Sequence, residues 1–395
     1  MDKRIIFTYL MLAGCVWMMS AGTFCGVHIS PMNYETTEEV SEAKVNFDNY
    51  KLRGTLYDRR MTPLVYTVVH DEDSGYHREF GSGYSRIFSN IIDGLADTSG
   101  LDSVFETILR TRDPNNEDGM VGTSVMLTMD SELQKRTYYT VNNYFSRHNL
   151  IGSAVIMKQN GEILSMVSLP AFDIEAYRRD ENVRLLQLGR GSTENKAIIG
   201  VEVPYDLFSP ATETICQKNT EYMLKNYLAF DNDIPIECDF AKLDNHIDSS
   251  EGTISCSPLY LAALMREYVF GDMVKPYVKS CKYSTYDNSL IEGTETEPQM
   301  IASLPGRYAE KVRAKLNNNA EDFEIKLAEN QKIYTLSAAT VYGCYICGAI
   351  VDEKDTENSK IYVLQVSSMQ SGITYDSSED MPEARRVFGN IVNEE

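Results

Sequence analysis

Residues 152–173, GSAVIMKQNGEILSMVSLPAFD, are the stretch that decides the fold. Two short apolar runs, Ser153–Met157 and Ile163–Ser168, flank Asn160-Gly161. Asn-Gly is typical of tight β-hairpin turns because both residues tolerate a positive φ. Each run has the length of a strand rather than that of a helix. The segment therefore predicts an antiparallel hairpin.

Helix and strand signals lie on both sides of this hairpin. The expected helices are 132–145 with Asp130-Ser131 as cap, 258–268 with Ser257 as cap, and 382–392 starting at Pro382. The expected strands are two within 51–69, joined at 59–62, and three at 124–129, 346–351 and 361–366. Strands, then helices, then strands and a last helix predict an α+β fold with helices packed on an antiparallel sheet.

Composition excludes several classes of protein. The chain has 395 residues, 43% hydrophobic and 10% aromatic, which is typical of a packed protein. Its 58 Asp and Glu outweigh 37 Lys and Arg, giving a net charge of −21. Nucleic-acid binding through phosphate neutralisation needs clustered basic residues, so we expect no nucleic-acid partner.

The N-terminus carries the one segment long and apolar enough to span a membrane. Residues 5–27 are uncharged and follow Lys3 and Arg4, so the positive-inside rule predicts a cytoplasmic tip (1–4), an anchor (5–28) and an exported body. We expect a single-pass cell-membrane protein with the bulk of the chain extracytoplasmic. Two alternatives remain: a lipoprotein modified at Cys15, whose preceding residues resemble a lipobox, and a cleaved signal peptide.

The cysteines and histidines give no metal or cofactor site. Six cysteines follow the anchor, and they either pair or are buried thiols. Cys344 and Cys347 have CxxC spacing, but no second pair completes a zinc site, and on the strand expected there they face opposite sides. The five histidines show no HxxxH or HExxH spacing. We expect neither a metal nor a cofactor.

Several segments together resemble the class B, monofunctional penicillin-binding proteins, which are bacterial peptidoglycan D,D-transpeptidases. The matching segments are RGTLYDR (53–59), SGLD (99–102), LTMD with LQ (127–134), the hairpin segment 152–173, and SCSPLYLAALMREYVFGDMVKPY (255–277). They occur in the family's order behind an N-terminal anchor. The likeness covers nearly the whole chain and is to the small cell-shape or sporulation type.

The resemblance implies a domain plan. It predicts a small β-rich pedestal at 29–120, with Asp58 and Arg59 as a structural pair, and a serine β-lactamase/transpeptidase-like domain at 121–395. The family's three catalytic motifs are SxxK, SxN and KTG, which supply the nucleophile, its base and the substrate-binding groups.

None of the three motifs is intact at its expected position. Asp206 and Ser209 replace the serine and lysine of SxxK in PYDLFSPAT (204–212). Gln217 and Asn219 mark the SxN position, and Thr335, Leu336 and Ser337 the KTG position. The only SxxK string, Ser41–Lys44, lies in the polar, acidic segment 30–50, which we expect to form a stalk after the anchor. Loss of nucleophile or base alone costs about 10⁶ in rate in an unrelated hydrolase, so Asp206 is interpreted as a helix cap and not as a nucleophile.

Three functions follow from this combination. The first is a catalytically inactive, penicillin-binding protein-like scaffold or regulator of a SEDS-type (RodA/FtsW-like) glycosyltransferase, the partner that the resemblance implies. The second is a divergent, active D,D-transpeptidase that cross-links peptidoglycan and binds penicillin. The third is a non-catalytic module that binds stem peptides, with peptidoglycan as its partner.

Overall fold

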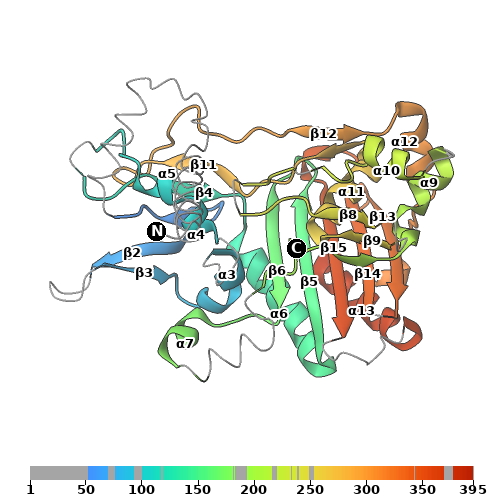
Figure 1. Cartoon of the computed structure of the whole chain (residues 1–395), viewed down its shortest axis with the longest axis horizontal. Helices are drawn as coiled ribbons and strands as arrows, with labels where there is room; N and C mark the ends of the chain where they lie inside the picture. The colour runs from blue at the N-terminus through green and yellow to red at the C-terminus, as the bar shows by residue number, and fades with distance from the viewer. Residues whose placement is uncertain are drawn as a thin grey trace, which may run out of the picture. The chain divides into compact units, whose positions relative to one another are not determined.

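An antiparallel sheet of five strands in the order β13-β14-β15-β5-β6 organises the larger part of the fold (Figure 1). Its strands are β5 (Leu150–Lys158), β6 (Ile163–Leu169), β13 (Gln331–Thr340), β14 (Gly343–Asp352) and β15 (Lys360–Ser368). The hairpin expected within 152–173 is confirmed as β5 and β6, and Gly161 has a φ of +98° in its turn. The expected pairing of β14 with β15 is confirmed as well.

The computed structural model describes most of the chain after residue 51. The described residues are 52–69, 76–92, 100–116, 119–180, 182, 194–215, 220–232, 234–237, 240–248, 253–341, 343–368 and 377–394. They belong to one compact unit, Tyr50–Glu395. Among them, no helix combines the length and the apolar character needed to cross a bilayer. The predicted tip, anchor and stalk, with Cys15 and Ser41–Lys44, lie outside the described residues.

Helices cover both faces of the five-stranded sheet. α6 (Ser131–His148) contacts β5 and β6, α13 (Ser377–Asn393) contacts β13 to β15, and the two helices contact each other. α11 (Pro258–Phe270) contacts β5, β14 and β15. Side chains alternate across a strand: Gly348 lies against Phe388 of α13, while Cys347 lies near Tyr268 of α11. The sheet therefore separates α6 and α13 from α11.

The expected helix starts are confirmed for two of these three helices. The Asp130 carboxylate accepts hydrogen bonds from the N–H groups of Glu132 and Leu133 at the start of α6. The Ser257 hydroxyl accepts from the N–H of Tyr260 at the start of α11, with Pro258 in the first turn. The third start is wrong. Proline is favoured in the first turn because its missing N–H costs nothing there, but α13 begins at Ser377 and contains Pro382.

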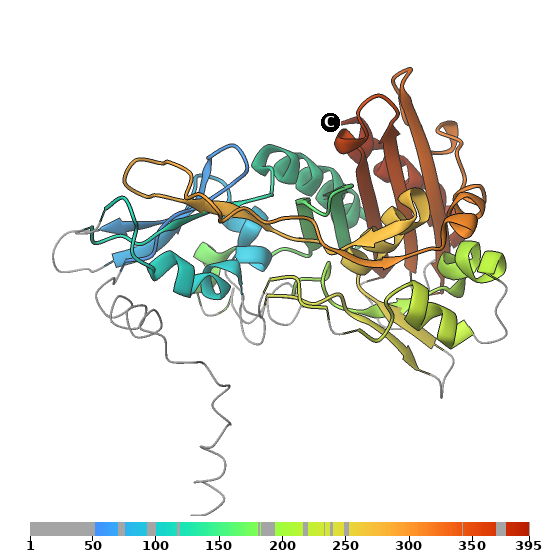
Figure 2. The same ribbon diagram turned by 90° about the horizontal axis from the view of Figure 1, so that it is seen from above.

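A second five-stranded sheet has the order β11-β4-β1-β2-β3, and we call the region built on it the pedestal. Its strands are β1 (Leu56–Tyr57), β2 (Pro63–Val69), β3 (Tyr76–Phe80), β4 (Ser124–Leu127) and β11 (Lys279–Tyr283). The two strands expected within 51–69 are β1 and β2. The edge strand β11 comes from far downstream and pairs antiparallel with β4. Figure 2 shows this yellow-orange segment running back across the pedestal strands.

Short helices and two small sheets complete the described residues. The helices are α3 (Ser85–Ile92), α4 (Leu101–Val104), α5 (Glu106–Arg110), α7 (Ile174–Arg179), α9 (Ser209–Ile215), α10 (Thr220–Tyr227) and α12 (Gly306–Arg313), with single turns η1 (Tyr205–Phe208), η2 (Glu321–Phe323) and η3 (Thr356–Asn358). One small sheet has the order β7-β9-β8, from Val201–Val203, Thr253–Cys256 and Asn245–Asp248, and the other pairs β10 (Asp272–Val274) with β12 (Met300–Ser303).

Candidate functional site

The position expected for the catalytic serine lies in the η1 turn. Asp206 is exposed there, while the neighbouring Leu207 and Phe208 are buried and anchor the turn. The Phe208 ring packs edge-to-face on Phe230 with centroids 5.3 Å apart. The carbonyl of Leu207 accepts a hydrogen bond from the Tyr268 hydroxyl of α11 at 3.2 Å. These contacts place η1 on the α11 side of the five-stranded sheet.

Asp206 and Ser209 are joined through the backbone. The Ser209 hydroxyl donates to the carbonyl oxygen of Asp206 at 2.8 Å. The interpretation of Asp206 as a helix cap is wrong, because η1 starts after Pro204 and has no side-chain capping bond, and Asp206 lies inside its first turn. A proline-led turn leaves one fewer N–H to satisfy, so a capping carboxylate is not needed.

The position expected for the KTG motif lies on β13, an edge strand that contacts η1. Thr335 lies opposite Gly348, and its methyl group and the Phe388 ring both lie against that glycine. The Ser337 hydroxyl accepts a hydrogen bond from Arg385 of α13 at 3.1 Å. Both residues therefore face α13. Alternation turns Leu336 to the opposite side, toward α11 and η1.

The side of β13 that faces η1 is therefore apolar at this point. Leu336 lies opposite Cys347, and Ala338 lies opposite Tyr345. Neither Leu336 nor Ala338 can hold a proton or a carboxylate. The two hydroxyls of the TLS string at 335–337 are on the wrong face for chemistry with Asp206.

The outer edge of β13 is also occupied at this point. The backbone N–H of Thr335 donates to the carbonyl of Asn317 at 2.7 Å, and the N–H of Asn317 donates to the carbonyl of Thr335 at 3.0 Å. The Thr335 hydroxyl also donates to the carbonyl of Asn317, at 3.3 Å. Since an edge strand recruits extended segments through such free groups, this chain satisfies its own edge where it passes Thr335. Nothing in the sequence signalled this role for Asn317.

The remaining expected site residues, Gln217 and Asn219, lie outside the described residues, as do Cys216 and Cys238. Three pockets of the described part of the chain have volumes of about 390, 460 and 150 Å³. None of these three is lined by Asp206, Ser209 or residues 335–337.

The four described cysteines are buried and form no disulfide. They are Cys256, Cys281, Cys344 and Cys347. Burial raises the pKa of Cys347 to about 12 and that of Cys256 well above its ordinary value. Such thiols stay protonated, and a thiol must be deprotonated to attack or to bind a metal. Within the described residues, no group of three or more His, Cys, Asp or Glu is arranged to hold a metal ion.

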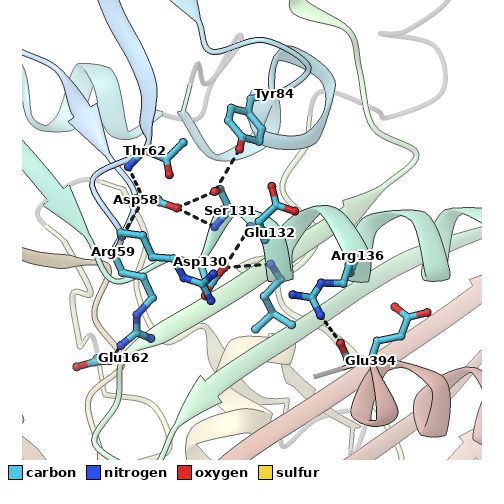
Figure 3. Close-up of polar contacts among 12 residues, drawn as sticks. Asp58, Arg59, Thr62, Tyr84, Asp130, Ser131, Glu132, Arg136, Glu162 and Glu394 are labelled. Carbon is cyan, nitrogen blue, oxygen red and sulfur yellow. Dashed lines mark hydrogen bonds and ion pairs between the residues drawn. The ribbon is translucent and has the colours of Figure 1, made fainter.

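A polar cluster at the junction of the two sheets is the best-formed constellation of charged groups (Figure 3). Asp58 is fully buried. One of its oxygens accepts from the N–H groups of Arg60 at 2.8 Å and Thr62 at 2.7 Å. The other accepts from the Ser131 hydroxyl at 2.6 Å and the Ser131 N–H at 3.3 Å. Asp58 thus fastens the β1–β2 turn to the start of α6.

Asp58 and Arg59, expected as structural residues, contact different partners. Arg59 instead forms an ion pair with Glu162, beside the β5–β6 turn, at 3.3 Å. Arg59 lies in the β1–β2 turn, after the end of β1, and reaches a different neighbour from Asp58. Both contacts join the pedestal to the larger domain, which is a structural role.

A second ion cluster, which is half-buried, lies inside the pedestal. The Asp102 carboxylate pairs with Arg53 at 2.5 Å and also with Arg78. Arg53 in turn pairs with Glu106 at 2.9 Å. The matched segments 53–59 and 99–102 thus meet in the structure through Arg53 and Asp102. Arg78 was not foreseen, because it lies on β3 in a stretch that showed no strand signal.

Comparison with solved structures identifies the architecture. The chain matches penicillin-binding protein A from M. tuberculosis, solved as an imipenem acyl-enzyme complex, with a TM-score of 0.64 at 12% identity, covering 88% of this chain and 100% of that one. The chain has the penicillin-binding transpeptidase fold. The D,D-transpeptidase domain of a peptidoglycan glycosyltransferase from Eggerthella lenta matches this fold with a TM-score of 0.61 at 13% identity, over 86% of this chain and 97% of that one.

Penicillin-binding protein 3 from M. tuberculosis gives a TM-score of 0.58 at 14% identity, over 86% of this chain and 94% of that one. No protein-family model and no curated protein matches the sequence. Identities this low establish the transpeptidase fold and leave the activity to be argued from the site.

Proposed function

We propose that this chain is a membrane-anchored, extracytoplasmic protein of peptidoglycan synthesis that has kept the transpeptidase fold and lost its chemistry. The observation that carries the proposal is the side of β13 that faces η1. Leu336 and Ala338 occupy it, while Thr335 and Ser337 face α13. A serine nucleophile needs a neighbouring base and a group that stabilises the oxyanion, and Asp206 with Ser209 supplies neither.

The role left for such a protein is that of a scaffold or regulator. Its proposed partner is a SEDS-type glycosyltransferase in the same membrane, reached through the anchor and the pedestal. A movement of the pedestal would carry the larger domain with it, because the Asp58–Ser131 contact and β11 join the two.

Labelling with a fluorescent penicillin tests the loss of chemistry. The full chain, purified in detergent, is expected to give no covalently labelled band. A band that disappears in Asp206→Ala would contradict the proposal and favour the divergent, active transpeptidase. A band that persists in Asp206→Ala would contradict it too, because another nucleophile would then be present.

Co-expression with the polymerase from the same cell tests the partnership. Co-purification and a change in glycan polymerisation are the expected results. If the two proteins neither associate nor affect glycan synthesis, the scaffold role is wrong. Binding of a stem pentapeptide, measured by calorimetry, would favour the peptide-binding alternative, which the closed edge at Thr335 and Asn317 disfavours.

A further inference from the structure

The outer side of α12 and the turn that follows it carry a stripe of positive charge. Residues 306–315 contain four basic residues and one acidic residue: Arg307, Lys311, Arg313, Lys315 and Glu310. Four positive charges and one negative charge give this segment a net charge of +3, in a chain whose net charge is −21. Arg307 and Lys311 are four residues apart, so they lie on one side of the helix at a step of about 6 Å along its axis.

The two cations on the helix are available to a partner. Arg307 and Lys311 are exposed, and within the described part of the chain neither forms an ion pair. The Arg307 guanidinium lies over the Tyr308 ring, 4.6 Å from its centroid. This stacking fixes the plane of the guanidinium and leaves the N–H donors at its edge free. By contrast, ion pairs neutralise the arginines of another basic group in the sequence, Arg53, Arg59 and Arg60.

The stripe borders the helix that follows the η1 turn. α12 contacts α11 and α9 (Figure 1). Glu213 of α9 is 66% exposed at its side chain and pairs with Lys315 at 2.8 Å, so one carboxylate neutralises the end of the stripe. Residues 216–219, the next in the sequence after α9, contain no Asp or Glu.

The apolar side of α12 is used inside the protein. Val312 is fully buried, and Ala309 lies against Gly271. None of the large hydrophobic side chains that are exposed in the described part of the chain belongs to residues 301–320. A protein interface usually has an apolar core, and a helix that lies on a membrane turns an apolar face to the lipid. A stripe of cations without such a face instead fits a polyanion, which binds through charge and the release of counterions.

We propose that the α12 stripe binds a linear polymer that carries a phosphate group in each repeat unit. Arg307 holds one phosphate through two parallel N–H···O bonds, and Lys311 contacts another as a point charge. Lys315 contributes less because Glu213 competes for it. The acidic remainder of the chain does not cancel the stripe, since at physiological ionic strength charges are screened over about 8 Å.

Titration of the full chain with end-labelled, short-chain inorganic polyphosphate tests the proposal. The chain is held in nanodiscs of zwitterionic lipid, and fluorescence anisotropy reports binding, which should weaken as the salt concentration rises. Arg307→Gln and Lys311→Gln should each weaken binding about fivefold, the upper value for an exposed ion pair. Each should also lower the slope of log Kd against log salt by about 0.7, the share of one phosphate contact.

Glu213→Gln provides a test in the opposite direction. It releases Lys315 from its ion pair, so polyphosphate should bind severalfold more tightly than to the parent. A loss of folding cannot produce such a gain. Lys135→Gln is the matched control, because it makes the same change in charge at an exposed position of α6, on the other side of the five-stranded sheet; its affinity should equal that of the parent.

Four results would overturn the proposal. They are no binding of polyphosphate at low salt, an equal loss in Lys135→Gln and Lys311→Gln, no gain in Glu213→Gln, and binding of poly-L-glutamate as tight as that of polyphosphate. The last result would show that the stripe takes carboxylate chains equally well and does not select phosphate.

Discussion

Replacement of Asp58 by alanine should destabilise the protein strongly, because this buried carboxylate fastens the pedestal to the larger domain. Asp58 is 0% exposed and accepts from four donors: the N–H groups of Arg60, Thr62 and Ser131 and the Ser131 hydroxyl. Asp58→Ala removes every acceptor at once, and the three N–H groups lose their partner in a dry site.

The magnitude follows from these contacts. A hydrogen bond to a charged group contributes about 1.5–3 kcal/mol, but bonds to one carboxylate are not additive. Loss of one member of a buried charged network costs about 3–5 kcal/mol, so we expect about 4 kcal/mol for Asp58→Ala. Asp58→Asn keeps one oxygen for Arg60 and Thr62 and turns an amide toward the Ser131 N–H, so we expect about 1–2 kcal/mol.

Equilibrium urea unfolding of the full chain measures both variants. Asp206→Ala is the control: Asp206 is exposed, and a surface substitution away from such a network should stay within about 0.5 kcal/mol. The reasoning would be refuted by an Asp58→Ala variant within about 1 kcal/mol of the parent, which is less than a single hydrogen bond to a charged group contributes. An Asp58→Asn variant as unstable as Asp58→Ala would refute the assignment of the two oxygens.

Three further predictions concern stability. Glu267 is fully buried with no hydrogen bond to either carboxylate oxygen, and burial raises its pKa well above the ordinary value. The folded chain keeps this proton and the unfolded chain releases it, so stability should fall by about 1.4 kcal/mol per pH unit above about pH 4.3 until the folded pKa is reached; Glu267→Gln should remove this slope from urea midpoints measured between pH 5 and 7. Gly152→Ala should lower the melting temperature, because φ is +150° there and the new methyl carbon would lie 2.1 Å from the carbonyl oxygen of Gln365; an unchanged melting curve would contradict this. Asp102→Asn should cost about 3–5 kcal/mol by leaving Arg53 and Arg78 without their shared carboxylate, and limited proteolysis should then cut the pedestal faster than in the parent.

Local signals in the sequence were enough to predict several helices and strands of the larger domain. The turn at Asn160-Gly161, the cap at Asp130 and the Ser257-Pro258 start each act within a few residues, and the structure contains all three. The transpeptidase fold was reached through segment order, and the solved structures match it.

Contacts between residues far apart in the sequence could not be predicted from local sequence patterns. Residues 112–119 have the composition of a linker, yet Asp113 is fully buried and accepts from the Ser284 hydroxyl at 2.9 Å and from the Thr285 N–H at 2.6 Å. The facing of Thr335 depends on strand register, and a shift of one residue reverses every side chain. Local composition carries no information on either point.

The position of β11 in the pedestal sheet has a consequence for how the protein is made. β4 leaves the ribosome more than a hundred residues before its partner β11 does. Until that partner arrives, the pedestal has an open edge able to pair with other chains. Completion of the pedestal sheet must therefore wait until most of the chain has been synthesised. A truncated product ending before Lys279 would display that edge, which makes it a natural target for quality-control proteases.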